Sequence, residues 1–142
     1  MKSTILVAAA ASTLLLSACA PLTRSAGALP FDRMNPKVYI VAKEHIVVDQ
    51  EPITFLKGEK GRIRWHLQDP DYQFDRASGI SGIKSLSGKR NDIRDCQLDK
   101  SDDRIFSCQN DNTGTETYKY TIVVIRRHDK ARLTLDPTVY ND

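Results

Sequence analysis

Residues 117–126 read TYKYTIVVIR, and this run predicts a β-strand at the centre of a sheet. Alternate positions carry Tyr118, Tyr120, Ile122 and Val124, and the positions between them begin with Thr117, Lys119 and Thr121. A period of two with β-branched and aromatic side chains is typical of a strand that buries one face. Val123 and Ile125 make the second face apolar as well, which favours a strand with neighbours on both sides.

The same period of two extends back to residue 37. Apolar residues alternate at Val38 and Ile40, Ile46 and Val48, Ile53 and Phe55, and Ile63, Trp65 and Leu67. Turn-forming residues separate these runs at 50–52, 57–61, 68–71 and 112–114. Further strands are expected around Phe74, over 80–86 and over 105–108, with a final short strand at Leu133 and Leu135 that ends at Asp136-Pro137. Short strands at this spacing predict an all-β domain over residues 37–142, an immunoglobulin-like or cupredoxin-like sandwich.

The first residues resemble the signal of a bacterial lipoprotein. Lys2 precedes an apolar run over residues 5–16, and Leu16-Ser17-Ala18-Cys19 matches the lipobox. The resemblance implies cleavage after Ala18, so that residues 1–18 are the signal peptide, and it implies acyl chains such as palmitate on Cys19. Several acyl chains make a stable membrane anchor. Ala20, where inner-membrane lipoproteins carry Asp, implies the outer membrane of a Gram-negative bacterium, with the anchor facing the periplasm.

A plain secretory peptide cut near Ala18 or Ala20 is the alternative to the lipobox. An uncleaved transmembrane helix is disfavoured, because the apolar run is too short to span the hydrocarbon layer. Residues 19–36 are rich in small residues and proline, and they predict a flexible tether behind the lipidated cysteine, with Phe31 or Met34 able to dock at its end.

The two remaining cysteines, Cys96 and Cys108, form an even pair in an exported chain. In an oxidising compartment such a pair predicts a disulfide, which is worth roughly 3 kcal/mol for so short a loop. Free or metal-binding thiols are the alternative, but the sequence offers them no close companions.

Trp65 shares a strand face with Ile63 and Leu67, and core packing is preferred to a role as a ligand platform. Arg62 and Arg64 lie on the opposite face. They are expected to form a solvated face or a strand edge guarded by charge, with a cationic binding patch as the alternative.

Several elements together resemble small exported cupredoxin-like domains of unassigned function. They are residues 63–67, Phe74 with Gly79-Ile80, Cys96 and Cys108 with Phe106, residues 118–122, and Asp136-Pro137 with Asn141. The resemblance implies a sandwich over residues 37–142. It does not extend to the copper site, because no His follows Cys96 or Cys108 at short range and the methionines are Met1 and Met34.

No other candidate site is compelling, and the sequence predicts no catalytic residue, cofactor or metal site. His45, His66 and His128 are far apart in the sequence. Residues 78–82 lack the spacing of a nucleophile elbow. The acidic loops with Asp99, Asp102 and Asp103, and with Asp111 and Asn112, do not match a calcium-binding loop.

The charge is nearly balanced, with 21 Lys and Arg against 18 Asp and Glu, and no basic stripe with interleaved aromatics indicates nucleic-acid binding. We therefore predict a non-enzymatic binding or structural lipoprotein that presents a sheet edge or loop surface to an envelope protein or polymer. One alternative is a metal-linked or hydrolytic periplasmic enzyme that uses His66, His128 and an aspartate. Another is an inhibitor of a cell-wall hydrolase that uses the loop 96–108.

Overall fold

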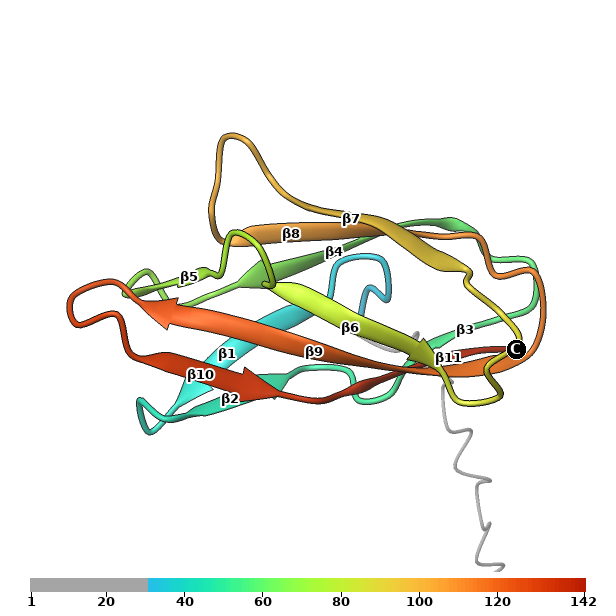
Figure 1. Ribbon diagram of the computed structural model, residues 1–142, viewed down its shortest axis with the longest axis horizontal. Coiled ribbons are helices and arrows are strands. Elements are labelled where there is room, and N and C mark those ends of the chain that lie inside the picture. The colour runs from blue at the N-terminus through green and yellow to red at the C-terminus, as the bar shows by residue number, and fades with distance from the viewer. Residues whose placement is uncertain (1–30) are drawn as a thin grey trace, which may run out of the picture.

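A computed structural model describes residues 31–142, and all of its regular structure is β-strand (Figure 1). The eleven strands are β1 (Lys37–Val41), β2 (His45–Val48), β3 (Ile53–Phe55), β4 (Gly61–Leu67), β5 (Tyr72–Phe74), β6 (Ile80–Ser85), β7 (Ile93–Leu98), β8 (Ile105–Asn110), β9 (Glu116–Arg126), β10 (Arg132–Leu135) and β11 (Thr138–Asn141). The predicted all-β class is confirmed. Within the described residues, no helix is long and apolar enough to cross a membrane. The predicted signal peptide 1–18, the predicted lipid attachment site Cys19 and the first part of the predicted tether lie outside the described residues.

The strands form two sheets. The first sheet has the order β2-β1-β4-β8-β7, in which only β1 and β4 pair in parallel. The second sheet is built on β9, which pairs with β10 and β11 along one edge and with β5 and β6 along the other, while β3 pairs in parallel with β11. The prediction of a strand with neighbours on both sides is therefore confirmed for β9.

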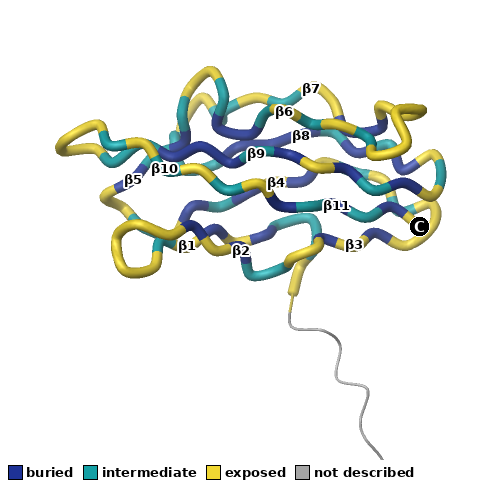
Figure 2. Tube along the Cα trace, turned by 60° about the horizontal axis from the view of Figure 1, so that its bottom comes forward, coloured by how far each residue is buried: buried dark blue, intermediate teal, exposed yellow. Residues whose placement is uncertain are grey.

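The core lies between the two sheets, where most strands bury one face (Figure 2). Trp65 on β4 is only 1% exposed, and its Nε1 donates a hydrogen bond of 3.1 Å to the hydroxyl of Tyr120 on β9. The two rings also touch, with their centroids 5.4 Å apart. Burial raises the pKa of the Tyr120 hydroxyl, which keeps it protonated at neutral pH. The core role predicted for Trp65 is confirmed, and the fold is sandwich-like; its immunoglobulin-like or cupredoxin-like type stays a prediction.

A buried pair of amides also joins the two sheets. Asn110 on β8 and Asn141 on β11 are both fully buried, and each side-chain nitrogen donates to the other's oxygen, at 2.9 and 3.0 Å. Buried amide groups are tolerated only when such bonds replace those to water. This reciprocal pair therefore fixes the position of the last strand against the first sheet.

The structure differs from the sequence prediction at its last strand. β10 was expected to end the fold at Asp136-Pro137, but the chain continues into β11, which buries Val139 and Asn141. Proline lacks an N–H group but keeps its carbonyl, and Pro137 accepts a hydrogen bond from the Tyr120 N–H at 3.1 Å. Pro137 thus precedes a strand and does not end the sheet.

The disulfide predicted between Cys96 and Cys108 is confirmed, and it joins β7 to β8 with the two Cα atoms 4.1 Å apart. β7 itself was not predicted. Its pairing with β8 shifts register between Arg94 and Gln97, and Asp95 has a positive φ of 52°. Because of this bulge, β7 places Ile93 and Leu98 on the same face although they are five positions apart. The period of two is broken, so alternation could not identify the strand.

Residues 34–36 lie alongside β4 as an extension of β1. The Arg64 N–H donates to the Met34 carbonyl at 2.7 Å, and the His66 N–H donates to the Pro36 carbonyl at 2.9 Å. Met34 also packs against the core, as expected for a residue that docks at the end of the tether. The chain therefore joins the domain beside the middle strand of the first sheet.

Candidate functional site

The outer face of the first sheet carries two arginines on its middle strand. Ile63, Trp65 and Leu67 of β4 face the core, so Arg62 and Arg64 face away from it. β4 lies between β1 and β8 and is not an edge strand. The interpretation of these arginines as guards of a strand edge is therefore wrong, and they stand on an open sheet face.

Beside the two arginines the outer face is hollowed, with a volume of about 270 Å³ over β4 and the β7–β8 hairpin. The hollow is lined by Arg62, Arg64, Gln97, Leu98, Asp99, Lys100 and Ser107. Arg62 Nη1 donates to Ser107 Oγ at 3.2 Å. Arg64, Ser107 and Gln97 are direct neighbours across β4, β8 and β7, because both ladders place them opposite each other.

Arg62 and Arg64 form no ion pair with any residue in the described part of the chain, unlike several arginines around them. Arg94 pairs with Asp111 at 2.8 Å, and Arg127 pairs with Asp103 at 2.5 Å. The two arginines of β4 therefore keep guanidinium donors that no carboxylate of residues 31–142 satisfies.

Asp99 is the carboxylate that lines the hollow, and it is engaged in its own turn. Its Oδ1 accepts hydrogen bonds from the Ser101 hydroxyl at 2.7 Å and from the Ser101 N–H at 2.8 Å. These bonds lower the pKa of Asp99, and the positive charge of Arg64 adds to the shift. Asp99 is thus ionised at neutral pH and orders the loop that carries Lys100.

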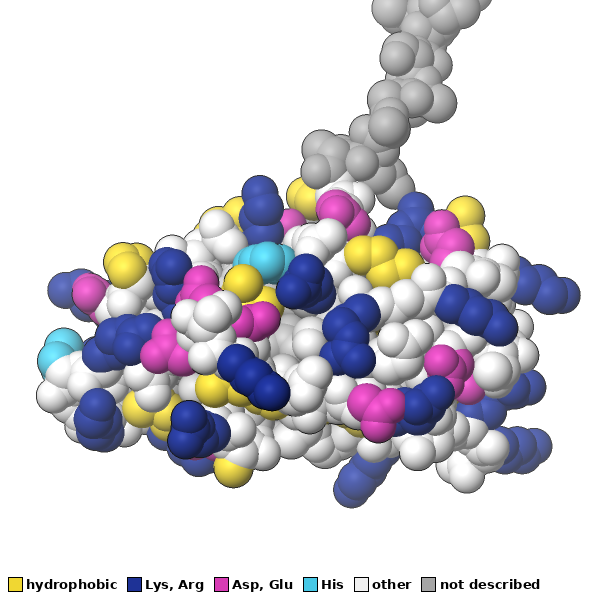
Figure 3. Space-filling view, turned by 90° about the horizontal axis from the view of Figure 1, so that it is seen from above, with side chains coloured by type: hydrophobic (Ala, Val, Ile, Leu, Met, Phe, Trp, Pro, Cys, Tyr) yellow, Lys and Arg dark blue, Asp and Glu magenta, His cyan; other side chains and the backbone are white. Residues whose placement is uncertain are grey.

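Exposed apolar side chains occupy one corner of the same face. Tyr39 and Val47 lie opposite each other on β1 and β2, and Val41 lies two residues further along β1. Figure 3 shows the molecule from above the view of Figure 1, where β4, β8 and β7 lie. Lys and Arg side chains are spread over this side, with Asp and Glu side chains among them. The face combines a cationic centre with a small apolar corner.

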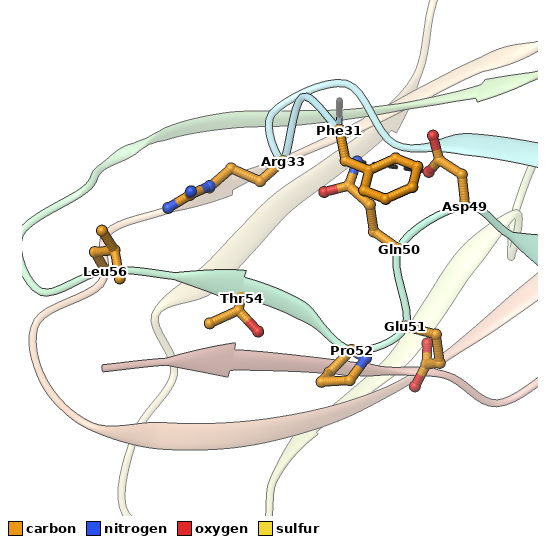
Figure 4. A pocket seen from close by; sticks show the side chains of 8 residues that line it. All are labelled: Phe31, Arg33, Asp49, Gln50, Glu51, Pro52, Thr54 and Leu56. Carbon is orange, nitrogen blue, oxygen red and sulfur yellow. Dashed lines mark hydrogen bonds between the residues drawn. The ribbon is translucent and has the colours of Figure 1, made fainter. Parts of the chain in front are cut away.

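A second hollow, of about 380 Å³, lies beside β3 where the chain joins the domain (Figure 4). Phe31, Pro52 and Leu56 give it apolar walls, and Phe31 and Leu56 are both about half exposed. Arg33 at its rim is held in an ion pair with Glu59 at 2.7 Å. This hollow offers apolar surface but no free charge from Arg33.

The three histidines belong to different elements and have different neighbours. His45 is exposed on β2, His66 on β4 lies 3.3 Å from Asn35 Oδ1, and His128 in the β9–β10 turn lies 3.5 Å from Asp129. In residues 31–142 no group of three His, Cys, Asp or Glu side chains could hold a metal ion. The structure therefore does not bring His66 and His128 into a common cluster with an aspartate.

The serine and acidic motifs serve local structure. Ser78 Oγ donates to Asp75 Oδ1 at 2.7 Å and accepts from Arg132 at 3.1 Å. Asp102 accepts from the Arg104 N–H at 2.9 Å, and this bond contributes most to the lowered pKa of Asp102. The loop over 99–104 that carries these acidic residues rises above β8 (Figure 1).

Sequence reasoning found Arg62 and Arg64 but missed Gln97, Lys100 and Ser107. The predicted disulfide could have indicated that Gln97 and Ser107 are neighbours, because Gln97 follows Cys96 and Ser107 precedes Cys108. A disulfide between neighbouring strands brings such residues side by side. It does not show that β4 is the next strand along.

The carboxylate of Glu116 holds the β6–β7 loop. It accepts hydrogen bonds from the hydroxyls of Ser85 and Ser87 and from the Thr117 N–H, and these bonds lower the pKa of Glu116 to about 2. An ionised Glu116 therefore stabilises the fold at pH values above the ordinary glutamate pKa, and this contribution disappears as the pH falls from about 5 to about 2.

We expect Glu116→Gln to be less stable than the wild type at pH 6, and we expect the difference in stability to shrink at pH 3. Urea unfolding at the two pH values measures it, and a difference independent of pH would contradict the assignment.

Neither the models of known protein families nor the sequences of curated proteins match this chain.

Proposed function

We propose that this protein is a non-enzymatic binding or structural module of the bacterial cell envelope. It is anchored in the outer membrane by lipid on Cys19 and presents the outer face of its first sheet to an envelope protein or polymer. The lipobox Leu16–Cys19 supports the anchor, and the elements shared with small exported cupredoxin-like domains support an exported sandwich of that type. Acyl chains on one cysteine would hold the chain in the bilayer.

The position of the anchor leaves the domain room to reach a partner. The backbone from Cys19 to Phe31 spans at most about 40 Å when fully extended. Because residues 34–36 are bonded along β4, the anchoring chain joins the domain beside the strand that carries Arg62 and Arg64. The same face can therefore meet either the membrane surface or a component next to it.

The observation that carries this proposal is that Arg62 and Arg64, both on the middle strand β4, form no ion pair within residues 31–142. A guanidinium that lacks a carboxylate partner is well suited to recognise an anionic group on another molecule. An exposed apolar corner on the same face adds area that a partner can cover. Arg62, Arg64 and the residues around them make a binding surface and need no catalytic group.

Two measurements test the proposal. Intact mass spectrometry of the purified protein should show a chain that begins at Cys19 and carries acyl chains, and an unmodified Cys19 would refute the anchor. Crosslinking in the native envelope should then capture one dominant protein or polymer, which Cys19→Ser should lose.

The double variant Arg62→Glu/Arg64→Glu should lose that partner while keeping its lipid. Lys84→Glu/Lys119→Glu is the matched control, because Lys84 and Lys119 are exposed and opposite each other on β6 and β9 of the second sheet. The control reverses two charges and should keep the partner. Equal recovery with both double variants would show that the arginine face is not the binding surface.

A further inference from the structure

We infer that the hollow over β4 and the β7–β8 hairpin binds a phosphate group, held by Arg62, Arg64, Lys100, Ser107 and Gln97. This inference rests on the proposed binding function, for which it names the chemical class of ligand. The phosphate is either part of a lipid headgroup or part of a soluble phosphate ester, and the experiment below separates the two sources.

The donors come from three neighbouring strands and from the loop after β7. Arg62 and Arg64 lie two residues apart on β4, at a spacing of about 7 Å along the strand. Ser107 lies directly opposite Arg64 on β8, and Gln97 lies opposite Ser107 on β7. Lys100 comes from the loop after β7 and closes a further side.

The local charge favours an anion. Within the described part of the chain, the lining of the hollow holds three cationic side chains, Arg62, Arg64 and Lys100, and one carboxylate, that of Asp99. The Oδ1 of Asp99 is already engaged by Ser101 and by the Asp102 N–H at 3.2 Å. The hollow therefore keeps a net positive charge together with neutral hydrogen-bond donors.

Phosphate fits this set of donors better than a carboxylate does. A carboxylate offers two oxygens in one plane, whereas a phosphate group is tetrahedral and offers two unesterified oxygens in a lipid diester, three in a monoester and four in the inorganic ion. Guanidinium groups bind phosphate oxygens in pairs, and a hydroxyl, an amide and an ammonium can reach the remaining oxygens from other directions. Among residues 31–142, no aromatic side chain lines the hollow for the stacking that single-stranded nucleic acids use.

The disulfide holds the donors in register. Cys96 and Cys108 are the direct neighbours of Gln97 and Ser107, so their bond ties together the strand positions that carry these two donors. Without it, the interrupted ladder of β7 would leave Gln97 and Lys100 less well fixed relative to β8. A site whose donors are fixed before binding loses less conformational freedom when the ligand arrives.

The first test is calorimetric titration of the mature chain, residues 19–142, with inorganic phosphate. Cys19→Ser is included so that no acyl chain attaches, and acetate at equal ionic strength is the reference anion. We expect saturable binding of one phosphate, at least ten-fold tighter than that of acetate. Arg62→Gln/Arg64→Gln should weaken it ten-fold or more, and Lys84→Gln/Lys119→Gln should leave it unchanged. Circular dichroism and thermal unfolding confirm that each variant folds.

Vesicles of phosphatidylglycerol in the same chain background identify the source. Vesicle binding that is competed by inorganic phosphate and lost with the arginine variant supports a lipid headgroup. Phosphate binding without vesicle binding supports a soluble phosphate ester. The inference is overturned if phosphate binds no better than acetate, or if both double variants lose binding equally.

The two proposals fail in different ways. If Arg62→Glu/Arg64→Glu loses the envelope partner but the unsubstituted arginine face does not bind inorganic phosphate, the proposed surface is correct and the proposed ligand class is wrong. If phosphate binds at the arginines while envelope capture is unaffected by them, the phosphate site stands and the proposed partner surface falls.

Discussion

Replacing Trp65 with alanine should lower the free energy of unfolding by about 3 to 5 kcal/mol, the range for large aromatic residues in a core. Trp65 is nearly fully buried and packs across the sandwich against Tyr120. The variant leaves a cavity and also deprives the buried Tyr120 hydroxyl of its hydrogen bond from Trp65 Nε1. Both losses weaken the contact between β4 and β9, which joins the two sheets.

Urea unfolding followed by circular dichroism measures this effect. Tyr39→Ala is the matched control, because Tyr39 is an aromatic residue of the same sheet whose side chain is 39% exposed on the outer face. It should change the free energy of unfolding by less than about 1 kcal/mol. Trp65→Phe keeps much of the apolar volume and removes the hydrogen bond, so it should fall between the two. Equal stability of Trp65→Ala and Tyr39→Ala would contradict the assigned core.

The strands that the sequence predicts most clearly are those in which the two faces differ in polarity over most of their length. β4 alternates Arg62, Ile63, Arg64 and Trp65, and each residue lies on the side that its polarity suggests. β9 was identified by the same pattern and by its apolar end at Val123 and Ile125. Local alternation is sufficient here because burial of one face is what stabilises such strands.

Prediction failed for β7, whose alternating pattern is interrupted, and for β11, whose place in the fold depends on distant residues. The bulge at Asp95 shifts the phase of β7, and β11 owes its place partly to Asn141, whose polar side chain is buried only because Asn110 from β8 satisfies it. An asparagine in a short run after Pro137 gives no sign of such a partner. The pairing of these two amides is set by the packing of the sheets.

The candidate site likewise has one part that the local sequence predicts and one part that it does not. The outward direction of Arg62 and Arg64 followed from the period of two. The row formed by Arg64, Ser107 and Gln97 depends on the strand order β4-β8-β7 and on the register of two ladders. These long-range properties are absent from any local stretch, so the hollow could be recognised only in the folded chain.

Removing the disulfide should lower the free energy of unfolding by about 3 kcal/mol, because the bond closes a short loop and restricts the unfolded chain. The two cysteines are 12 positions apart. Cys96→Ala/Cys108→Ala is the suitable variant, since Cys108 is fully buried and serine would place a hydroxyl in the core. Wild-type protein in a reducing buffer is the matched comparison, because it loses the bond and keeps both sulfur atoms.

Hydrogen exchange locates this loss of stability. β7 is an edge strand whose hydrogen-bonded ladder is interrupted between Arg94 and Gln97, the segment that contains Cys96. The disulfide therefore holds β7 where its backbone bonds do not, and loss of the bond should speed exchange in β7 more than in β4 or β9. If the double variant and the reduced protein both keep wild-type stability and slow exchange in β7, the packing of Ile93 and Leu98 suffices to hold the strand. In that case the disulfide also does not fix Gln97 and Lys100 beside the arginines, and phosphate binding should survive reduction.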